Sequence, residues 1–215
     1  MNNLRIERKF VYQAGDNSYE YFLINGMFKK IYPKRRVNSI YFDNESLKNV
    51  WDNINGFSNR VKIRLRWYNN LNDSEVYLEE KKKINFSTIK KVKSVGKFKN
   101  FNDLSNFINS DLQYDNFFLK NKYTIFKTLY VSYNRDYFEE KTKKLRVTID
   151  KNLRIYKKFK SNFIDIDKNI VEFKYHPKNS NFVNNFALYH DLKNRNQKFS
   201  KYVNSFIDLN ESGLA

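Results

Sequence analysis

The sequence contains no cysteine, only 5 glycines and 2 prolines, and no long apolar run. The lack of cysteine excludes disulfides, thiolate nucleophiles and zinc sites built on thiolates. The scarcity of glycine and proline leaves no flexible linker, so we expect one domain over residues 1–215. The first residues, MNNLRIERKF, have no apolar signal core, and no stretch reaches the roughly 18 apolar residues of a membrane helix. We therefore expect a soluble, cytoplasmic protein without a transmembrane segment.

Positive charge dominates the composition. The chain has 41 lysines and arginines against 23 acidic residues, which gives a formal net charge of +18 at pH 7. A balance this basic indicates a polyanionic partner, such as nucleic acid, an anionic membrane or a phosphate compound. Lysine and asparagine are used heavily throughout, so part of the charge reflects composition alone. The positions of the cations must therefore decide between these partners.

The clearest local pattern is RVKIRLRWY at residues 60–68. Four cations alternate with four apolar residues, which predicts a strand with one cationic and one apolar face. Similar alternation predicts strands at 4–12, 37–44, 75–83, 87–95, 129–138, 144–153 and 169–176. Amphipathic spacing predicts helices at 17–31, 44–54, 101–112 (capped by Asn102 or Asp103) and 181–209, the last in two pieces. About eight strands joined mostly by hairpins indicate an α+β protein built on an antiparallel sheet.

The cationic face recurs on several of these strands. An ordinary solvated face is the simpler interpretation for any one of them, but solvated faces usually mix both signs of charge. Residues on the same face lie about 6.6 Å apart along a strand, where two unit charges repel by about 2.5 kcal/mol at an effective dielectric constant near 20. That repulsion becomes attraction when the face closes around phosphate, which arginine binds as a fork and lysine as a point charge.

Carboxylates make this pattern more specific. Glu7, Glu79 and Glu172 fall on the same strand faces as the cations. A surface that only binds nucleic acid gains nothing from carboxylates there, whereas a metal–phosphate complex does, because hard oxygen ligands hold Mg²⁺ or Mn²⁺. Closing the sheet into a barrel would point all these side chains into one lumen.

Nine short stretches carry a family resemblance. They are ERKF (7–10), NSIYFDN (38–44), KIRLRWY (62–68), LEEKKK (78–83), KKVK (90–93), SYNRDYF (132–138), LRVTIDKNL (145–153), VEFKYH (171–176) and FSKYV (199–203). In this order they resemble the VTC domain, the polyphosphate polymerase domain of the CYTH-like triphosphate tunnel metalloenzyme superfamily. The resemblance covers nearly the whole chain.

The resemblance implies an eight-stranded antiparallel β-barrel, or tunnel, with helices packed outside it and a C-terminal helix. It also implies a polyphosphate polymerase that transfers the γ-phosphate of ATP to a growing inorganic polyphosphate chain, with Mn²⁺ or Mg²⁺ as cofactor. The implied partners are thus ATP and polyphosphate, and no nucleic acid is expected.

The resemblance also assigns site residues. The cations that would line the tunnel and act on the phosphates are Lys9, Arg64, Arg66, Lys81, Lys91, Arg135, Arg146 and Lys201. Further substrate contacts would come from Tyr133, Ser200, Lys62, Lys93 and Lys174. Glu172 would hold the metal, and Glu7 and Glu79 would help with the metal or orient neighbouring cations.

Two positions depart from the family's pattern. Arg5 stands where the wider superfamily often has the first glutamate of an E-x-E-x-K motif, which argues against a simple hydrolytic triphosphatase. Lys93 stands where arginine is expected. The chain also lacks the regulatory domain and membrane segments of the eukaryotic polymerase, so we expect it to act alone or beside a separate membrane protein.

Several alternatives stay open. The same fold could serve an inorganic triphosphatase, a nucleotide-cyclising enzyme or a non-catalytic polyphosphate-binding module. A nucleic-acid-binding domain could stack bases on Phe10, Trp67 and Tyr68, but the strand pattern places aromatic residues mainly on apolar faces. We expect a structural role for His190, whereas His176 could lie at a tunnel rim. The sequence leaves the nucleotide donor, the preferred metal, the product length and the oligomeric state undetermined.

Overall fold

The computed structural model describes residues 5–24, 26–85, 87–110, 112, 125–156, 163–190, 192 and 197–212. Nine strands are found in these ranges: β1 (Ile6–Gln13), β2 (Phe28–Asp43), β3 (Arg60–Tyr68), β4 (Val76–Ile84), β5 (Ser87–Gly96), β6 (Phe126–Glu140), β7 (Arg146–Tyr156), β8 (Phe163–Ile166) and β9 (Lys168–Tyr175). The helices are α1 (Glu20–Ile24), α2 (Lys48–Ile54), α3 (Phe101–Asn109), the 3₁₀ helix η2 (Pro177–Asn179), α5 (Ser180–Tyr189) and α6 (Lys201–Glu211).

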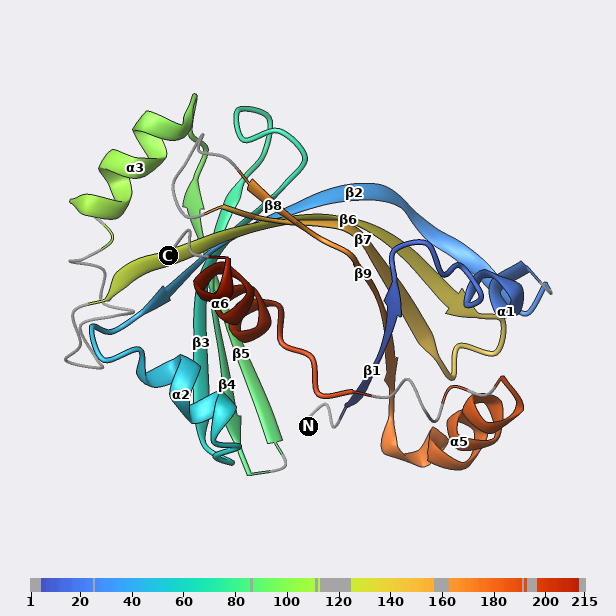
Figure 1. The fold of residues 1–215 in the computed structure, drawn as a ribbon. Helices are drawn as coiled ribbons and strands as arrows, with labels where there is room; N and C mark the ends of the chain where they lie inside the picture. The colour runs from blue at the N-terminus through green and yellow to red at the C-terminus, as the bar shows by residue number, and fades with distance from the viewer. Residues whose placement is uncertain are drawn as a thin grey trace. The chain divides into compact units, whose positions relative to one another are not determined.

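The strands form a single sheet in the order β1-β9-β7-β6-β2-β3-β4-β5, with β8 paired to β7 (Figure 1). The pairings of β1 with β9, β9 with β7, β2 with β3, β3 with β4 and β4 with β5 are all antiparallel. The α+β class, the antiparallel sheet and the C-terminal helix expected from the sequence are therefore confirmed. The strand count rises to nine because the sequence pattern did not reveal the short strand β8.

Two helix predictions were wrong in detail. The helix expected over 17–31 ends at Ile24, and β2 begins at Phe28. Between them Gly26 has a φ of +69°, a left-handed backbone conformation that glycine adopts without strain. The helix expected over 101–112 covers only Phe101–Asn109, and its cap is Asn100, whose side chain accepts from the backbone N–H groups of Asn102 and Asp103.

The chain divides into two compact units. The first comprises Met1–Arg36, Tyr133–Arg154 and Asp165–Ser200, and the second comprises Val37–Ser132, Ile155–Ile164 and Lys201–Ala215. Strands β2, β6 and β7 each contribute residues to both units. The single domain expected over residues 1–215 stays a prediction. Within the described ranges, no helix combines the length and apolar character needed to cross a membrane.

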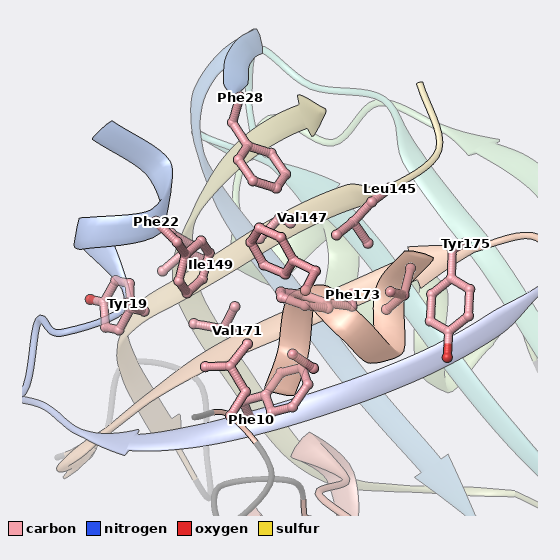
Figure 2. Close-up of a cluster of buried hydrophobic side chains, with 14 of the residues drawn as sticks. Phe10, Tyr19, Phe22, Phe28, Leu145, Val147, Ile149, Val171, Phe173 and Tyr175 are labelled. Atoms are coloured by element: carbon pink, nitrogen blue, oxygen red, sulfur yellow. The ribbon is translucent and has the colours of Figure 1, made fainter. Parts of the chain in front are cut away.

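The core of the first unit lies on one face of β1, β9 and β7. Phe10 is opposite Val171, which is opposite Ile149, and alternate residues along each strand join the same cluster. Phe173 lies at its centre, with ring centroids 4.7 Å from Phe10 and 5.9 Å from Phe186 of α5 (Figure 2). Because strand side chains alternate, this packing directs the polar residues of β1 and β9 to the other face.

In the second unit, too, apolar side chains lie on one face of the sheet and form the core. On β3 and β4, Leu65 is opposite Leu78, and both are fully buried. Helix α3 covers these residues with Leu104 and Ile108, its two buried side chains. The apolar half of RVKIRLRWY therefore packs inward against α3, and its cations are left on the opposite face of the sheet.

Phe173→Ala should test how far the first core supports strand β9. Removing a fully buried phenylalanine leaves a cavity and typically lowers the free energy of unfolding by about 3–5 kcal/mol. Chemical denaturation followed by circular dichroism measures this change. Tyr21→Ala is the control, because Tyr21 is 67% exposed and its loss should change stability by less than about 1 kcal/mol. Equal effects of the two substitutions would contradict this description of the core.

Candidate functional site

Cations of the second unit lie in rows across neighbouring strands. Lys62 of β3 is opposite Lys81 of β4, and Lys81 is opposite Lys90 of β5. The next row on the same face contains Tyr41, Arg64 and Glu79, and the row after it contains Ser39, Arg66 and Tyr77. Like charges directly opposite each other destabilise a sheet. A row of three lysines is therefore a feature that folding alone does not explain.

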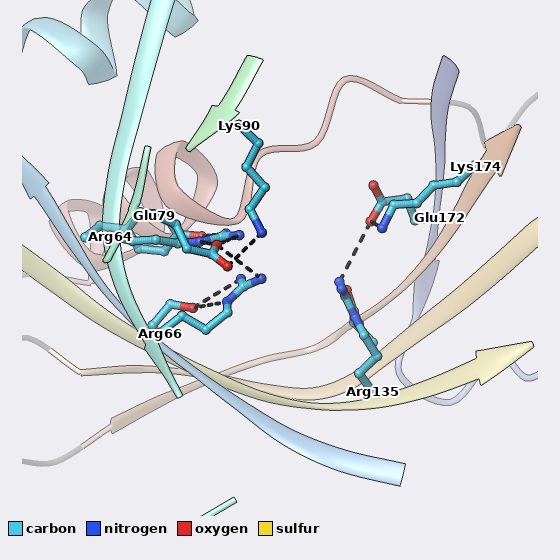
Figure 3. A network of polar contacts seen from close by, with 10 residues as sticks. Arg64, Arg66, Glu79, Lys90, Arg135, Glu172 and Lys174 are labelled. Carbon is cyan, nitrogen blue, oxygen red and sulfur yellow. Dashed lines mark hydrogen bonds and ion pairs between the residues drawn. The ribbon is translucent and has the colours of Figure 1, made fainter. Parts of the chain in front are cut away.

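Glu79 is the carboxylate around which the second unit's cations gather (Figure 3). Arg64 donates to its Oε2 atom from Nε at 2.8 Å and from Nη2 at 2.6 Å, and Lys90 donates to Oε1 at 2.8 Å. Nη1 of Arg66 lies 3.8 Å from Oε2. Burial alone would raise the pKa of Glu79, but the charges of Arg64, Arg66 and Lys90 lower it to about 2. Glu79 is thus ionised at neutral pH and holds these cations in place.

Arg66 is held by hydrogen bonds that it donates to the neighbouring strand β2. It is 6% exposed, and its Nε and Nη2 atoms each donate to the Ser39 hydroxyl at 3.2 Å. Arg64 donates from Nη1 to the Tyr41 hydroxyl at 3.3 Å. Each arginine therefore has a fixed guanidinium plane, which is the arrangement that recognises phosphate oxygens in pairs.

Helix α6 brings Lys201 to the same region of the second unit. The Tyr202 ring stacks on Tyr41 with centroids 4.8 Å apart, and its hydroxyl donates to Asp43 at 2.8 Å. Burial alone would raise the pKa of Tyr41, but the charges of Arg64, Arg66 and Lys201 lower it. Lys201, which is buried and precedes Tyr202 on α6, is thus one of the cations that act on Tyr41.

The first unit contains a second polar cluster, centred on Arg135. Asp150 is fully buried and accepts from Arg135 Nε at 2.5 Å and from Nη2 at 2.7 Å. Nη2 of Arg135 also lies 3.8 Å from Glu172, and Lys174 Nζ lies 3.5 Å from the same carboxylate (Figure 3). Burial alone would lower the pKa of Arg135, but Asp150, Tyr133 and Glu172 hold it well above its ordinary value. Asp150 therefore fixes a permanent cation beside Glu172.

Lys174 has an unusually low pKa for a lysine. Burial lowers its pKa to about 8, with Arg135 acting in the same direction and Glu172 and Glu7 acting against it. Glu7 of β1 is directly opposite Lys174 in the sheet. Lys174 is therefore mostly protonated at pH 7 and loses its proton as the pH rises through about 8.

Three other expected residues of the first unit lie on or near this polar face. Lys9 is opposite Glu172, and its Nζ donates to the carbonyl of Phe199 at 2.6 Å, next to Ser200 in the chain. Tyr133 is buried, and the Arg135 guanidinium lies 5.3 Å from its ring centroid. Arg146 is opposite Lys174, but its half-exposed side chain pairs with Glu139 at 2.8 Å instead of Glu172.

The sequence interpretation placed two lysines on the wrong face. Lys91 is opposite Glu80 and Lys93 is opposite Leu78, so both lie on the opposite face of the sheet from Arg64 and Glu79. Lys90 takes the position expected for Lys91. In KKVK, Lys90 points to one face of the strand, and Lys91 and Lys93 point to the other. Alternation alone therefore could not show which of these lysines shares the cationic face. The interpretation also missed Ser39, Tyr41 and Asp150, whose roles follow from cross-strand partners instead of a local pattern.

The expected metal ligands do not form a complete metal cage. Across the part of the chain that the structure describes, no group of three or more His, Asp and Glu side chains could hold a metal ion. Both oxygens of Glu79 accept from Arg64 or Lys90, and Asp150 is held by Arg135. Glu172 lies 3.5 Å from Lys174 Nζ and 3.8 Å from Arg135 Nη2. One carboxylate together with substrate phosphates is a usual way to bind Mg²⁺, so Glu172 fits a metal delivered with phosphate.

The two histidines take structural positions. Nδ1 of His176 accepts from the backbone N–H of Lys178 at 3.2 Å and so caps η2. The His190 ring lies between aromatic neighbours, with centroids 5.4 Å from Phe22 and 4.5 Å from Phe186. The structural role expected for His190 agrees with this packing.

The sequence matches a family model over almost its full length. The model is described as the VTC domain, and it covers residues 5–209. The chain belongs to the VTC domain family. The family resemblance carried by the nine short motifs is therefore confirmed, and this VTC domain contains both polar clusters within the matched range. A comparison with curated protein sequences gives no significant match.

Solved structures share the fold of this VTC domain. The PH1819 protein from Pyrococcus horikoshii OT3 is 12% identical over 96% of this chain and 99% of its own, with a TM-score of 0.57. A proposed adenylate cyclase from Vibrio parahaemolyticus is 10% identical over 95% of this chain and 99% of its own, with a TM-score of 0.53. HpAC1 from Hippeastrum, a proposed adenylyl cyclase with a dominant triphosphatase activity, is 10% identical over 97% of this chain and 96% of its own, also with a TM-score of 0.53.

Glu79→Gln should destabilise the VTC domain in a pH-dependent way. The pKa of Glu79 is about 2 in the folded state and near 4.5 without its partners, so the charged form stabilises the fold above about pH 5. We expect the substitution to lower the free energy of unfolding by about 2–3 kcal/mol at pH 7. The difference from the unmodified protein should shrink as the pH falls from 5 towards 2, because Glu79 itself then becomes neutral.

Urea denaturation at a series of pH values measures this difference. Glu45→Gln is the control, because Glu45 is exposed. A Glu79→Gln effect that stays constant between pH 7 and pH 2 would show that the carboxylate charge does not organise these cations.

Proposed function

We propose that this VTC domain is a polyphosphate polymerase that transfers the γ-phosphate of ATP to a growing chain of inorganic phosphate. The observation that supports this most strongly is the excess of cations on one face of the second unit. Lys81 is directly opposite both Lys62 and Lys90, and the next two rows on this face add Arg64 and Arg66. The carboxylate among them, Glu79, neutralises only one of these five charges.

A linear chain of phosphates matches this face better than a compact anion does. The cations form rows that cross three strands, which lie about 4.8 Å apart, and same-face residues repeat every 6.6 Å along each strand. Arginine forks and lysine charges at these intervals can bind successive phosphate groups. The family's fold implies a tunnel, and we propose that this cationic face of the second unit contributes to its lining.

The cluster of the first unit suits the metal-dependent part of the reaction. We propose that Glu172 holds Mg²⁺ or Mn²⁺ together with phosphate oxygens. Such a metal neutralises the charge that develops on the transferred group. Arg135, fixed by Asp150, and Lys174 lie within 4 Å of the same carboxylate and would bind the remaining phosphate oxygens. Lys9, directly opposite Glu172, belongs to the same set.

The reaction needs no covalent intermediate with the protein. A terminal oxygen of the acceptor phosphate attacks the γ-phosphorus of ATP, the bond from that phosphorus to the β–γ bridging oxygen breaks, and ADP leaves with that oxygen. Phosphoryl transfer of this kind depends on positioning the reactants and neutralising their charge. The fixed arginines supply both functions without moving at the moment of reaction.

Two observations favour a polymerase over the alternatives. The whole-chain match is to the VTC domain, and Arg5 replaces the first glutamate of the motif associated with hydrolytic relatives. The triphosphatase activity of HpAC1 keeps hydrolysis as the second candidate. We also propose a cytoplasmic protein that acts alone or beside a separate membrane protein.

Incubation with γ-labelled ATP and Mn²⁺ or Mg²⁺ tests the proposal directly. Gel separation should show a ladder of long phosphate chains, and Arg66→Ala and Glu172→Ala should lower its rate of formation at least about tenfold, since each removes a charged contact. The sharpest comparison is between two adjacent lysines. Lys90→Ala should slow synthesis about tenfold, whereas Lys91→Ala, on the opposite face, should leave the rate within about twofold.

Each other outcome assigns a different function. Free phosphate or pyrophosphate in place of a ladder would make the protein a triphosphatase or a cyclase. No turnover together with polyphosphate binding that is lost in Arg66→Ala would make it a non-catalytic binding module. Equal effects of Lys90→Ala and Lys91→Ala would contradict the choice of face.

A further inference from the structure

An aromatic cluster lies on β2 and β6 of the first unit. The rings of Tyr32 and Tyr137 meet edge to face with centroids 5.6 Å apart. The Arg35 guanidinium lies over both, 5.5 Å from the Tyr32 centroid and 6.0 Å from the Tyr137 centroid. Tyr32 remains 49% exposed, so much of its surface faces solvent.

This cluster adjoins the phosphate-binding residues of the same unit. Tyr137 follows Arg135 by two positions on β6. The next residue, Phe138, packs against the hydrophobic core of the unit, so Tyr137 points to the opposite face of the strand, the face of Arg135. The two residues are therefore about 6.6 Å apart along one face.

We propose that Tyr32, Arg35 and Tyr137 form the subsite for the nucleobase of the nucleotide donor. This inference rests on the proposed function, because it assumes that phosphates bind at Arg135, Lys174 and Glu172. Every nucleobase has a π face that stacks on tyrosine rings, and the plane of a guanidinium group stacks on it as well. A separation of about 6.6 Å leaves room for the ribose between a base at Tyr137 and phosphates at Arg135.

The aromatic cluster is not needed to join strands β2 and β6. The strands are already joined beside it by the ion pair of Lys30 with Asp136, at 3.0 Å, and by the backbone hydrogen bond from Lys141 to the Met27 carbonyl. A tyrosine that served packing would be buried, as Tyr12 and Tyr19 are in the core of the same unit. The subsite would let the protein distinguish a nucleoside triphosphate from an inorganic triphosphate of the same charge.

Calorimetric titration with two ligands tests the subsite. ATP and inorganic tripolyphosphate, each with Mg²⁺, are compared in the unmodified protein and in Tyr32→Ala, Tyr137→Ala and Arg35→Lys. The loss of one stacking ring should weaken ATP binding about tenfold or more and leave tripolyphosphate binding within about twofold. Arg35→Lys keeps the charge but removes the guanidinium plane, so it should also weaken only ATP binding.

The controls separate stacking from general damage. Tyr21→Ala removes another exposed tyrosine of the same unit and should change neither affinity. Tyr32→Phe keeps the ring and should retain ATP binding, which excludes a role of the hydroxyl alone.

Two results would overturn the subsite. One is unchanged ATP binding in all three cluster variants, and the other is an equal loss of ATP and tripolyphosphate binding. Both would leave the polymerase proposal intact, since phosphate binding by the unmodified protein would still be observed. An unmodified protein that binds neither ligand would instead remove the proposed function and the subsite together.

Discussion

Repulsion between like charges is the constraint that the second unit must satisfy. Lys81 is directly opposite both Lys62 and Lys90, and the next two rows on this face add two arginines. At about 5 Å and an effective dielectric constant near 20, each such pair repels by about 3 kcal/mol unless the side chains splay into water or bind anions. The fold tolerates this because the other face of the same strands is packed against α3, with Leu65, Leu78 and Leu104 fully buried. The apolar face therefore stabilises the sheet, and the opposite face carries the charge.

The carboxylates of the two clusters differ in how closely they contact their arginines. Asp150 and Glu79 accept short, direct hydrogen bonds from arginine, which fixes the positions of the guanidinium groups. The contacts of Glu172 with Arg135 and Lys174 are longer, at 3.8 and 3.5 Å. A metal–phosphate complex could exchange with these contacts: the metal would take Glu172, and the two cations would turn to the phosphate. Little reorganisation would then be needed on binding, which is what electrostatic catalysis requires.

Strict alternation made β3 predictable to its ends, because Val61, Ile63, Leu65 and Trp67 alternate with four cations before Tyr68. The same reasoning failed at KKVK, where lysines occupy both phases and only the pairing with β4 shows that Lys90 shares the face of Glu79. It also extended the first helix past Ile24, since Met27, Phe28 and Ile31 fit a helical period as well as the start of a strand. Asp150 was missed as a site residue because its importance lies in a tertiary contact with Arg135 that no local spacing reveals. Where apolar and cationic residues alternate strictly, the strand and its faces thus follow from the sequence, whereas the faces of KKVK, the register and the long-range pairs require the structure.

A crystal structure of the protein grown with tripolyphosphate and Mn²⁺ would test the central claim most directly, since the anomalous signal of manganese locates the metal independently of the phosphate density. Our account predicts an anomalous peak bonded to the Glu172 carboxylate and to phosphate oxygens, with phosphate groups contacting Arg135 in the first unit. It also predicts phosphate density over the face of Arg64 and Arg66 in the second unit. Manganese bound away from Glu172, or phosphate density over the face of Lys91 and Lys93, would contradict it.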